Sequence, residues 1–343
     1  MPFQVLNKWN YLLDDFSSSQ KDIYYREEYV KLYETALEKA ICFFYYEGSD
    51  YFLFPYLLRK FNYQAICLYD FETPYGYGGP ITNTLKNDFI DRALDSFYNY
   101  GKENNYVAGF VRFHPLLENI NGFSQIGEIL LDRKTIAIDL HLDLDHIWQN
   151  EIHTKNRNVI KKGLKNGLTF IADYNYSYLD VFMNLYKNTM SRLNADVFYY
   201  FDAEYFRNIK KNIENSFLGL VLFKEKVLAS AIFFYSGIYG HYHLSGSDKD
   251  ALNFSPNNFM LWEAAKEMKK YGVQKFHLGG GTDSDEHNSL YEFKKKFSKS
   301  EYSFYIGKII FNPSLYEELC IEWQKKNPEK LIAYSHHLLK YKY

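Results

Sequence analysis

The 343-residue sequence predicts an α/β protein with mixed sheets that is built from two similar halves. Apolar runs separated by short turns occupy residues 40–59 and again residues 217–247, a pattern typical of antiparallel hairpins or meanders. A helical segment precedes each of them, at residues 20–39 and 174–193. Because a helix followed by a meander occurs twice, we expect a duplicated α/β unit.

The second half continues with a helix and a further strand. Ser255 is placed to cap this helix, Pro256 fits its first turn, and Gly272 follows as its stop. The apolar run at residues 273–281 is the next strand. A strand, a helix and a strand joined by a short return indicate a parallel crossover beside the meander, and hence a mixed sheet flanked by helices.

The chain is expected to divide into three parts. A strand-like alternation at residues 135–150 gives way to a helical segment, so the predicted N-terminal domain covers residues 1–150. The predicted C-terminal domain covers residues 151–312. Residues 313–343 are expected to form one or two amphipathic helices that pack back on the body.

Composition limits the class of protein. Hydrophobic residues make up 47% of the chain and aromatic residues 20%, which permits a large core and argues against disorder. The 34 tyrosines and 29 phenylalanines fit either sugar-stacking surfaces or a codon bias toward these residues. A net charge of −2 is unlike that of a general nucleic-acid binder, although it leaves room for a local basic patch.

Cysteine content and hydropathy predict a cytoplasmic protein. Cys42, Cys67 and Cys320 are odd in number and too widely spaced for a disulfide scaffold or a zinc ribbon. The N-terminal residues lack the pattern of a signal peptide, and charges interrupt the most apolar stretch, so no transmembrane segment is expected. Peripheral contact with the inner face of a membrane stays open.

Four stretches carry candidate site residues, and the first is a glycine- and proline-rich loop at residues 69–83. Such a loop fixes the backbone while it presents aromatic faces to a carbohydrate or nucleotide. The candidate binding residues there are Tyr75, Gly76, Tyr77 and Gly78. A purely structural turn is the alternative.

The second stretch, at residues 111–119, carries Arg112 and His114 at a predicted strand end. Alternation places both side chains on one face, where the arginine fork suits a phosphate or a carboxylate. A buried ion pair of Arg112 with Glu118 is the alternative.

The third stretch is a basic helix at residues 153–167. Five basic residues give it a positive excess, while Val159, Ile160 and Leu164 are expected to face inward. Arg157 and Lys161 are the candidate contacts for an anionic substrate. A solvated surface helix is the alternative.

The fourth stretch, at residues 277–298, begins with three glycines after a strand. Backbone N–H groups in a turn made of Gly279, Gly280 and Gly281 can approach a ligand, although many such turns are only tight turns.

A helix with a lysine cluster follows this glycine turn. Asn288 or Ser289 is expected to cap the helix, and its buried stripe is predicted at three apolar positions, Leu290, Phe293 and Phe297. Lys294 is expected at the edge of that stripe, where it either stabilises an oxyanion during acyl transfer or is an ordinary surface lysine.

Other catalytic motifs are absent. The sequence contains no HExxH, GxSxG or Walker motif, and three consecutive glycines do not make a GxGxxG motif. His241 and His243 alternate on a predicted strand but lack a third ligand, so no metal is expected.

Taken in order, the four stretches resemble FemAB-like proteins of the GNAT acyltransferase superfamily. The similarity rests on PYGYGGP, VRFHPLLEN, NRNVIKKGLKNGL and the segment that runs from HLSGSDKD through LGGG to FKKKF. It covers roughly residues 29–312. The family includes peptidoglycan-bridge transferases and acetyltransferase-like proteins of polysaccharide gene clusters. The resemblance implies two tandem GNAT-like domains, an N-terminal one on the acceptor side and a C-terminal one on the acyl-donor side, with the acceptor in the cleft between them.

The resemblance also implies roles for particular residues. In the bridge transferases a phenylalanine–lysine pair lies in the active site, where the lysine assists acyl transfer, and this pair falls on Phe293 and Lys294. One departure concerns the donor. GNAT enzymes grip the coenzyme A pyrophosphate with a glycine-rich loop, whereas the corresponding residues 248–254 are acidic and contain no glycine.

The predicted function is N-acyl transfer from an acyl-CoA, foremost acetyl-CoA, to the amine of an amino sugar. The acceptor would be a cell-envelope polysaccharide or its nucleotide-linked or lipid-linked precursor. One alternative keeps the fold but uses an aminoacyl-tRNA to extend a peptidoglycan stem peptide; the near-neutral chain argues against tRNA and the basic helix argues for it. A non-catalytic binding module is the other alternative. The candidate general bases are Asp283, Asp285, His287 and His243.

Overall fold

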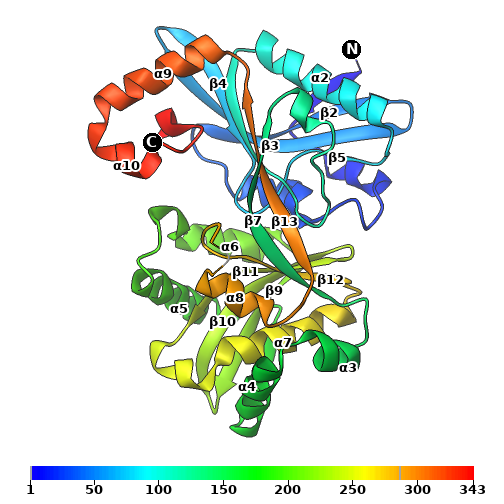
Figure 1. The fold of residues 1–343 in the computed structure, drawn as a ribbon, viewed down its shortest axis with the longest axis vertical. Coiled ribbons are helices and arrows are strands. Elements are labelled where there is room, and N and C mark those ends of the chain that lie inside the picture. Colours follow the sequence, from blue (N-terminus) through cyan, green and yellow to red (C-terminus); the bar gives the residue numbers. More distant parts are fainter. Residues whose placement is uncertain (1, 286) are drawn as a thin grey trace. The chain divides into compact units, whose positions relative to one another are not determined.

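The computed structural model describes residues 2–285 and 287–343 (Figure 1). The chain forms two compact units. Unit 1 consists of Met1–Asp132 together with Ser303–Tyr343, and unit 2 consists of Arg133–Tyr302.

The chain leaves unit 1 inside strand β7 (Glu128–Asp139) and returns to it inside strand β13 (Glu301–Ile310). These limits differ from the predicted domain boundaries after residues 150 and 312. A change of unit in the middle of a continuous strand leaves no mark in composition, so the sequence could not indicate it. The tail after residue 312 belongs to unit 1.

Unit 1 is built on a mixed sheet in the order β1-β2-β3-β4-β6-β13. β4 and β6 run parallel, and the other neighbouring strands run antiparallel. The hairpin predicted at residues 40–59 is confirmed as β2 and β3. The strand bounds are β1 (Phe3–Leu6), β2 (Glu38–Glu47), β3 (Asp50–Tyr63), β4 (Ile66–Glu72), β5 (Ile81–Thr82), which pairs with β3, and β6 (Tyr106–Arg112).

Helix α2 (Asn87–Glu103) and the C-terminal tail cover this sheet. The apolar residues of α2, among them Phe89 and Phe97, pack in one aromatic-rich core with β2, β3 and β4. The tail comprises α9 (Pro313–Lys326) and α10 (Leu331–Tyr334), in agreement with the expectation of one or two helices. It packs back on the sheet through Leu319, Leu338 and Leu339.

The helix predicted at residues 20–39 is mostly wrong. Only a single 3₁₀ turn (Ile23–Tyr25) and the short α1 (Glu27–Lys31) form there. Thr35 stops helical continuation, because its hydroxyl accepts hydrogen bonds from the backbone N–H groups of Leu37 and Glu38, where β2 begins.

Within unit 2 the strands follow the order β7-β12-β11-β10-β9-β8, with parallel and antiparallel pairs. The predicted meander is confirmed as β9, β10 and β11, and the predicted parallel crossover as β11, α7 and β12. The strand bounds are β8 (Leu168–Asp173), β9 (Ser216–Phe223), β10 (Lys226–Ser236), β11 (Tyr239–Ser247) and β12 (Lys275–Gly280). The helix bounds are α3 (Leu144–His146), α4 (Thr154–Lys165), α5 (Leu179–Arg192), α6 (Ala203–Asn212), α7 (Pro256–Lys270) and α8 (Ser289–Lys295).

Helix α7 begins and ends where predicted, but the predicted N-cap hydrogen bond does not form. Pro256 occupies the first turn, and Gly272 follows the helix with φ +76°. Ser255 lies at the N-cap position but adopts a left-handed conformation, φ 51°, and its side chain makes no capping hydrogen bond. The helix packs its apolar face, including Phe259, Leu261 and Met268, into the core of unit 2.

Among the helices that the structure describes, none combines the length and the apolar character needed to cross a membrane.

Candidate active site

The glycine turn, Gly279–Gly281, joins β12 to the loop before α8. Gly279 has φ +79°, and the pairing of β12 with β7 shifts register at this point. A Cβ at Gly280 would lie 2.6 Å from the carbonyl oxygen of Lys134, and a Cβ at Gly281 would lie 2.7 Å from the side chain of Asn288. Each glycine is thus required by the packing of the chain on itself, a reason that the sequence alone did not reveal.

Lys294 lies under this turn and is buried, with 7% of its surface exposed. Its Nζ donates a hydrogen bond to the carbonyl oxygen of Gly280 at 2.7 Å. Among the described residues, no carboxylate forms an ion pair with Lys294. The expectation of a lysine at the edge of the apolar stripe is therefore wrong: the ammonium group itself points inward.

Burial, and secondly the nearby charge of Arg133, lower the pKa of Lys294 to about 7. Arg133 donates from Nη1 to the carbonyl oxygen of Gly281 at 2.9 Å. Two cations therefore bind successive carbonyl groups of one turn. An uncompensated buried lysine is costly for folding, and such groups are concentrated at functional sites.

Helix α8 presents a different face to the core than the apolar pattern predicted. Asn288 caps the helix as expected and accepts hydrogen bonds from the N–H groups of residues 290 and 291. Leu290 is exposed, however, and Tyr291 is buried in its place. Phe297 is buried as predicted, and Phe293 is half-buried against it in an edge-on contact at 5.6 Å.

The loop between the glycine turn and α8 carries three of the four predicted general bases, Asp283, Asp285 and His287, and all three are exposed. The carboxylate of Asp283 accepts hydrogen bonds from the backbone of Asp285 and the side chain of Asn288, and these bonds lower its pKa. Asp285 accepts in turn from the backbone N–H of His287 at 2.9 Å. Both carboxylates therefore shape the loop.

The fourth predicted base, His243, lies on β11 against Tyr205 of α6. Its Nε2 is 2.7 Å from the tyrosine hydroxyl. Burial, and secondly the neighbouring His241, lower the pKa of His243 to about 3, so that its imidazole is neutral at physiological pH. The ring of His241 lies beside that of His277 on β12, with centroids 5.7 Å apart.

The parallel strands β11 and β12 are paired only at their beginnings. The ladder comprises Tyr239 with Lys275, Gly240 with Phe276 and His241 with His277. Within the described chain it then ends, although β11 continues to Ser247. Parallel strands that separate leave backbone groups with which an extended ligand can pair. Within unit 2, the separation of β11 from β12 and the glycine turn both come after this three-residue ladder.

The acidic loop before α7, residues 248–254, contains no glycine and therefore lacks glycine amides that could bind an anion. Asp248 forms an ion pair with Lys226 at 2.5 Å and accepts a hydrogen bond from the N–H of Asp250. The start of α7 is left without a side-chain cap, since Ser255 makes none. Pro256 has no N–H, and the N–H groups of Asn258 and Phe259 donate to the carbonyl oxygen of Ser255, so among the described bonds the N–H of Asn257 is the first-turn amide left for a phosphate.

Helix α4 turns a different face inward than predicted. Asn156, Ile160 and Gly163 are buried, whereas Leu164 is 64% exposed and Val159 is half-buried. The polar inward position has a partner, because Asn156 accepts a hydrogen bond from Asn258 of α7 at 2.7 Å.

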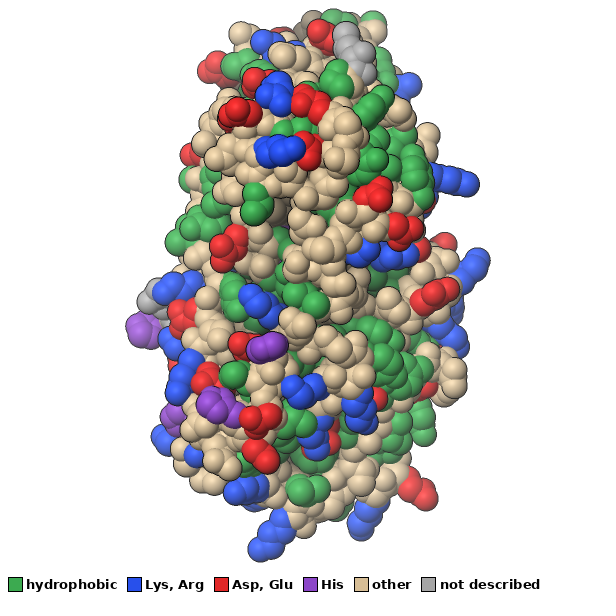
Figure 2. Space-filling view, turned by 90° about the vertical axis from the view of Figure 1, so that its right-hand side faces the viewer, with side chains coloured by type: hydrophobic (Ala, Val, Ile, Leu, Met, Phe, Trp, Pro, Cys, Tyr) green, Lys and Arg blue, Asp and Glu red, His purple; other side chains and the backbone are tan. Residues whose placement is uncertain are grey.

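The two candidate anion contacts on α4 also have structural roles. Arg157 donates from Nη1 to the carbonyl oxygens of Trp148, Gln149 and Ile152, and so closes the turn before the helix. The ammonium of Lys161 lies 5.8 Å from the centre of the Trp148 ring. The exposed lysines of α4 form no ion pairs within the described chain; they are Lys155, Lys161, Lys162 and Lys165. Figure 2 shows basic side chains at the lower end of its face, the end at which Figure 1 places α4.

In unit 1, residues 73–80 form a loop over buried tyrosines, here called the tyrosine loop. Tyr29 donates to the carbonyl oxygen of Tyr75 at 2.7 Å, and Tyr25 donates to that of Gly78 at 2.8 Å. Asn119 donates to the same Gly78 oxygen at 2.8 Å.

Aromatic packing completes the tyrosine loop. The half-buried ring of Tyr77 meets Tyr24 edge-on at 5.3 Å. Gly76 has φ +93°, and a Cβ there would lie 2.5 Å from Tyr24. Tyr24, Tyr25 and Tyr29 were missed because their segment resembles a helix; three tyrosines within six residues were the available signal.

Arg112 and His114 lie close to this loop but bind protein groups. Arg112 donates to Glu72 at 3.1 Å and to the carbonyl oxygen of Thr73 at 2.5 Å. The predicted alternative of an ion pair is thus confirmed in kind, but the partner is Glu72 and not Glu118.

His114 follows the end of β6 and is fully buried. Its Nδ1 accepts from the backbone N–H groups of Leu116 and Leu117 at 3.2 Å, which leaves the proton on Nε2. Nε2 therefore donates to Asp22 at 2.7 Å. This histidine has a structural role in the described contacts.

Comparisons with known proteins find a family match within unit 2. Residues 154–295 match the model of the acetyltransferase (GNAT) domain. No curated protein matches the sequence. Among solved structures, the chain is similar to FemX, with 16% identity over 92% of this chain and 99% of that one and a TM-score of 0.71.

Two further structures share the fold at lower scores. One is the C-terminal domain of a protein named as a lysylphosphatidylglycerol synthetase from Agrobacterium fabrum, with 14% identity over 86% of this chain and 89% of that one and a TM-score of 0.53. The other is a tandem GNAT protein from the clavulanic acid biosynthesis pathway, with 6% identity over 91% and 99% and a TM-score of 0.50.

These findings confirm the predicted fold class and enzyme class. Residues 154–295 match the GNAT acetyltransferase domain model, and the chain shares its fold with FemX and with a tandem GNAT protein. At such low identities the structural likeness establishes the fold, and the substrates have to be argued from the site itself.

Proposed function

We propose that this protein is an N-acyltransferase that moves an acyl group, acetyl foremost, from an acyl-CoA to the amine of an amino sugar in a cell-envelope polysaccharide or its precursor. The observation that carries the proposal is the buried Lys294, which has no carboxylate partner among the described residues and lies at the glycine turn of the GNAT domain. A cation kept in such a place suits the negative charge that develops during acyl transfer.

The reaction requires one bond to form and one to break. The amine attacks the thioester carbonyl, a C–N bond forms, and negative charge develops on the carbonyl oxygen. Collapse of this tetrahedral intermediate breaks the C–S bond and expels the thiolate of coenzyme A, which takes up a proton. Lys294 in its ammonium form, with Arg133 behind it, stabilises the oxyanion.

The proton of the attacking amine needs an acceptor. Asp283 and Asp285 accept hydrogen bonds that shape their loop, and the pKa of His243 is about 3, so none of the three is favoured as the base. Solvent water is therefore the proposed acceptor at the exposed loop, with His287 as the remaining candidate from the sequence.

The donor site is proposed at the opening between β11 and β12. The carrier arm of coenzyme A contains amide groups, and separated parallel strands offer backbone groups to pair with them. The pyrophosphate would lie beside the start of α7. Because acyl-CoA is a cytoplasmic donor, the proposal places the reaction in the cytoplasm.

The acceptor site is proposed at the tyrosine loop of unit 1. Tyr75 and Tyr77 are half-buried, and the backbone of their loop is held by three side-chain hydrogen bonds, one to Tyr75 and two to Gly78. Pre-ordered aromatic rings suit stacking on a sugar.

A second candidate donor is an aminoacyl-tRNA, which would make the acceptor a peptidoglycan stem peptide. Two observations favour it: the lysines of α4 have no acidic partners within the described chain, and the likeness to FemX extends over 92% of this chain. Polyanion binding through such lysines would depend strongly on salt.

Calorimetric titration with acetyl-CoA, followed by transfer assays, separates the two donors. The proposal expects saturable acetyl-CoA binding and acetylation of an amino-sugar panel that is insensitive to RNase. RNase-sensitive transfer of a labelled amino acid to a stem peptide would support the second donor instead. If neither donor gives turnover, the protein is a binding module and the proposal fails.

A further inference from the structure

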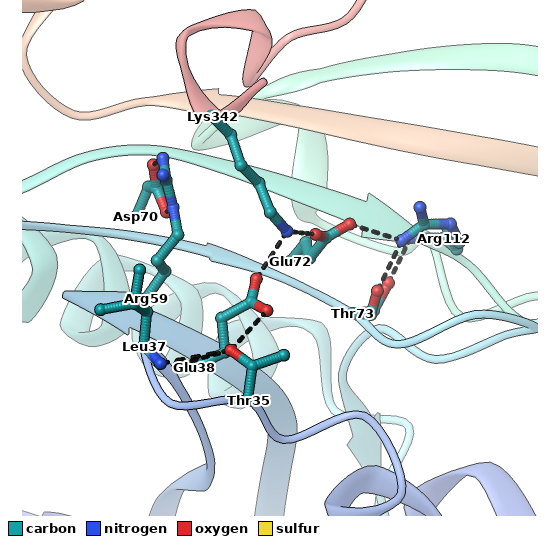
Figure 3. Close-up of polar contacts among 9 residues, drawn as sticks. All are labelled: Thr35, Leu37, Glu38, Arg59, Asp70, Glu72, Thr73, Arg112 and Lys342. Atoms are coloured by element: carbon teal, nitrogen blue, oxygen red, sulfur yellow. Dashed lines mark hydrogen bonds and ion pairs between the residues drawn. The ribbon is translucent and has the colours of Figure 1, made fainter. Parts of the chain in front are cut away.

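A chain of charges reaches from the C-terminal tail to the start of the tyrosine loop (Figure 3). Lys342 donates from Nζ to Glu38 at 2.5 Å and also to Glu72. The other carboxylate oxygen of Glu72 accepts from Arg112 at 3.1 Å. Figure 3 shows Lys342 descending onto the two glutamates, with Arg112 on the far side of Glu72.

The four charges neutralise one another in a largely buried place. Glu38 is 8% exposed, and the side chains of Glu72, Arg112 and Lys342 are 16%, 20% and 21% exposed. Burial raises the pKa of Glu72, but Lys342 and Arg112 outweigh this and lower it to about 2. Without Lys342, Glu38 would lose its cationic partner and Glu72 would be held by Arg112 alone, so both carboxylates would be held less firmly.

Arg112 connects Glu72 to the tyrosine loop. Its guanidinium binds the carbonyl oxygen of Thr73, and its own N–H donates to the Thr73 hydroxyl at 2.8 Å. Thr73 is fully buried, and its N–H donates to Phe110 at 3.0 Å. A Cβ at Gly78 would lie 3.1 Å from the methyl group of Thr73, so the two residues are packed closely.

We propose that Lys342 is a positioning residue for the tyrosine loop: it orients Glu72, which orients Arg112, which fixes Thr73. Through these residues the C-terminal tail orders the tyrosine loop, although Lys342 makes no described hydrogen bond to that loop. Binding of the acceptor at the tyrosine loop rests on the proposed function, whereas the effect of Lys342 on the order of this loop does not.

Hydrogen–deuterium exchange of the full chain tests the proposal without any substrate. In Lys342→Met, amides of residues 74–82 should exchange about tenfold faster, whereas those of residues 277–295 in unit 2 should not change. Lys342→Arg should restore slow exchange, because a guanidinium can bind both glutamates. Should Lys342→Met fail to fold, Glu72→Gln should show the same loosening of the loop.

Arg59→Met is the matched control. Arg59 forms the neighbouring buried ion pair of the same sheet, with Asp70, and its guanidinium lies over Tyr341 of the tail at 5.7 Å. It has no described bond to Glu72 or Thr73. This variant should lose stability while exchange in residues 74–82 stays slow.

Two results would overturn the proposal: unchanged loop exchange in both Lys342→Met and Glu72→Gln, or equal acceleration in Arg59→Met. With an active acceptor, Lys342→Met should raise the acceptor KM about fivefold or more and leave kcat and the donor KM within twofold. A failure of the proposed function would appear as absence of turnover in the wild type, which leaves the exchange comparison intact.

Discussion

The two parallel strand pairs of this molecule follow the same plan and end differently. In unit 1, β4 and β6 remain paired to the last residue of β4, Glu72, and Thr73 adds a further bond to Phe110. In unit 2, β11 and β12 separate after His241 and His277.

The charges beside the ends of these two strand pairs also differ between unit 1 and unit 2. Glu72 at the closed end has two cationic partners, Arg112 and Lys342, and the local charge is balanced. Lys294 beside the open end has a carbonyl oxygen as its partner and no described carboxylate. Buried charges that are paired with opposite charges hold a scaffold together. A buried charge without an opposite charge lowers stability, and such charges are concentrated at functional sites.

The largest expected effect is on the open side. Lys294→Met should lower turnover between about tenfold and a thousandfold, because it removes the proposed oxyanion donor. Steady-state kinetics on the wild type and the variant measure this. Lys296→Met, a neighbouring exposed lysine of the same segment, is the control and should retain full activity. Equal rates for wild type and Lys294→Met would remove Lys294 from the mechanism.

The same substitution should stabilise the protein. Between about pH 7 and pH 10.5 the unfolded chain carries a proton on Lys294 that the folded chain has released, so wild-type stability rises with pH in this window. Lys294→Met should therefore add about 2–4 kcal/mol below pH 7, and the gain should shrink as pH approaches 10.5. Urea unfolding at a series of pH values tests this; a loss of stability at pH 6 would contradict it.

The prediction for activity has the opposite dependence on pH. If the ammonium form of Lys294 is required, kcat should fall as pH rises through about 7, since its pKa has that value. A rate that rises through the same pH would instead make the neutral amine the working form.

On the closed side, the expected effects are on stability. Arg59→Met leaves Asp70, which is 1% exposed, without its cation and should cost about 3 kcal/mol. Burial outweighs Arg59 and keeps the pKa of Asp70 raised, so the pair is retained at a cost. The double variant Arg59→Met with Asp70→Leu should therefore lose less than the single one. Denaturant unfolding of both variants checks this order, and a larger loss in the double variant would refute it.

The smallest expected effect concerns α4. Replacing Lys155, Lys162 and Lys165 by glutamine should change acyl-CoA turnover by less than about twofold, because exposed lysines contribute little. With an aminoacyl-tRNA donor, the same triple variant should lose affinity and reduce the dependence of affinity on salt. Transfer assays at two salt concentrations distinguish these outcomes.

The sequence predicted those parts of the fold that depend on local signals. Pro256 and Gly272 bracket α7, and Asn288 caps α8, because each acts within its own turn. The apolar pattern misassigned two helix faces, since Leu164 and Leu290 are exposed while Asn156 and Lys294 point inward. A buried polar group has its partner elsewhere in the chain, and no helical period indicates that partner.

The candidate site was predicted in part for the same reason. The glycine turn and the helix after it are adjacent in sequence, so their proximity was predictable. The supports of the tyrosine loop come from Tyr25, Tyr29 and Asn119, which are distant in sequence and meet only in the folded unit. Lys342 is farther still, and nothing local to it indicates that it reaches Glu72.

A pH titration of the Lys294 side chain by NMR measures directly whether burial lowers the pKa of this lysine. In protein labelled with ¹³C at the lysine Cε position, the resonance that is absent from Lys294→Met identifies this side chain. The account predicts a midpoint near pH 7, set by burial and by Arg133. A midpoint near the ordinary value of about 10.4 would show a solvated or paired ammonium and contradict the account.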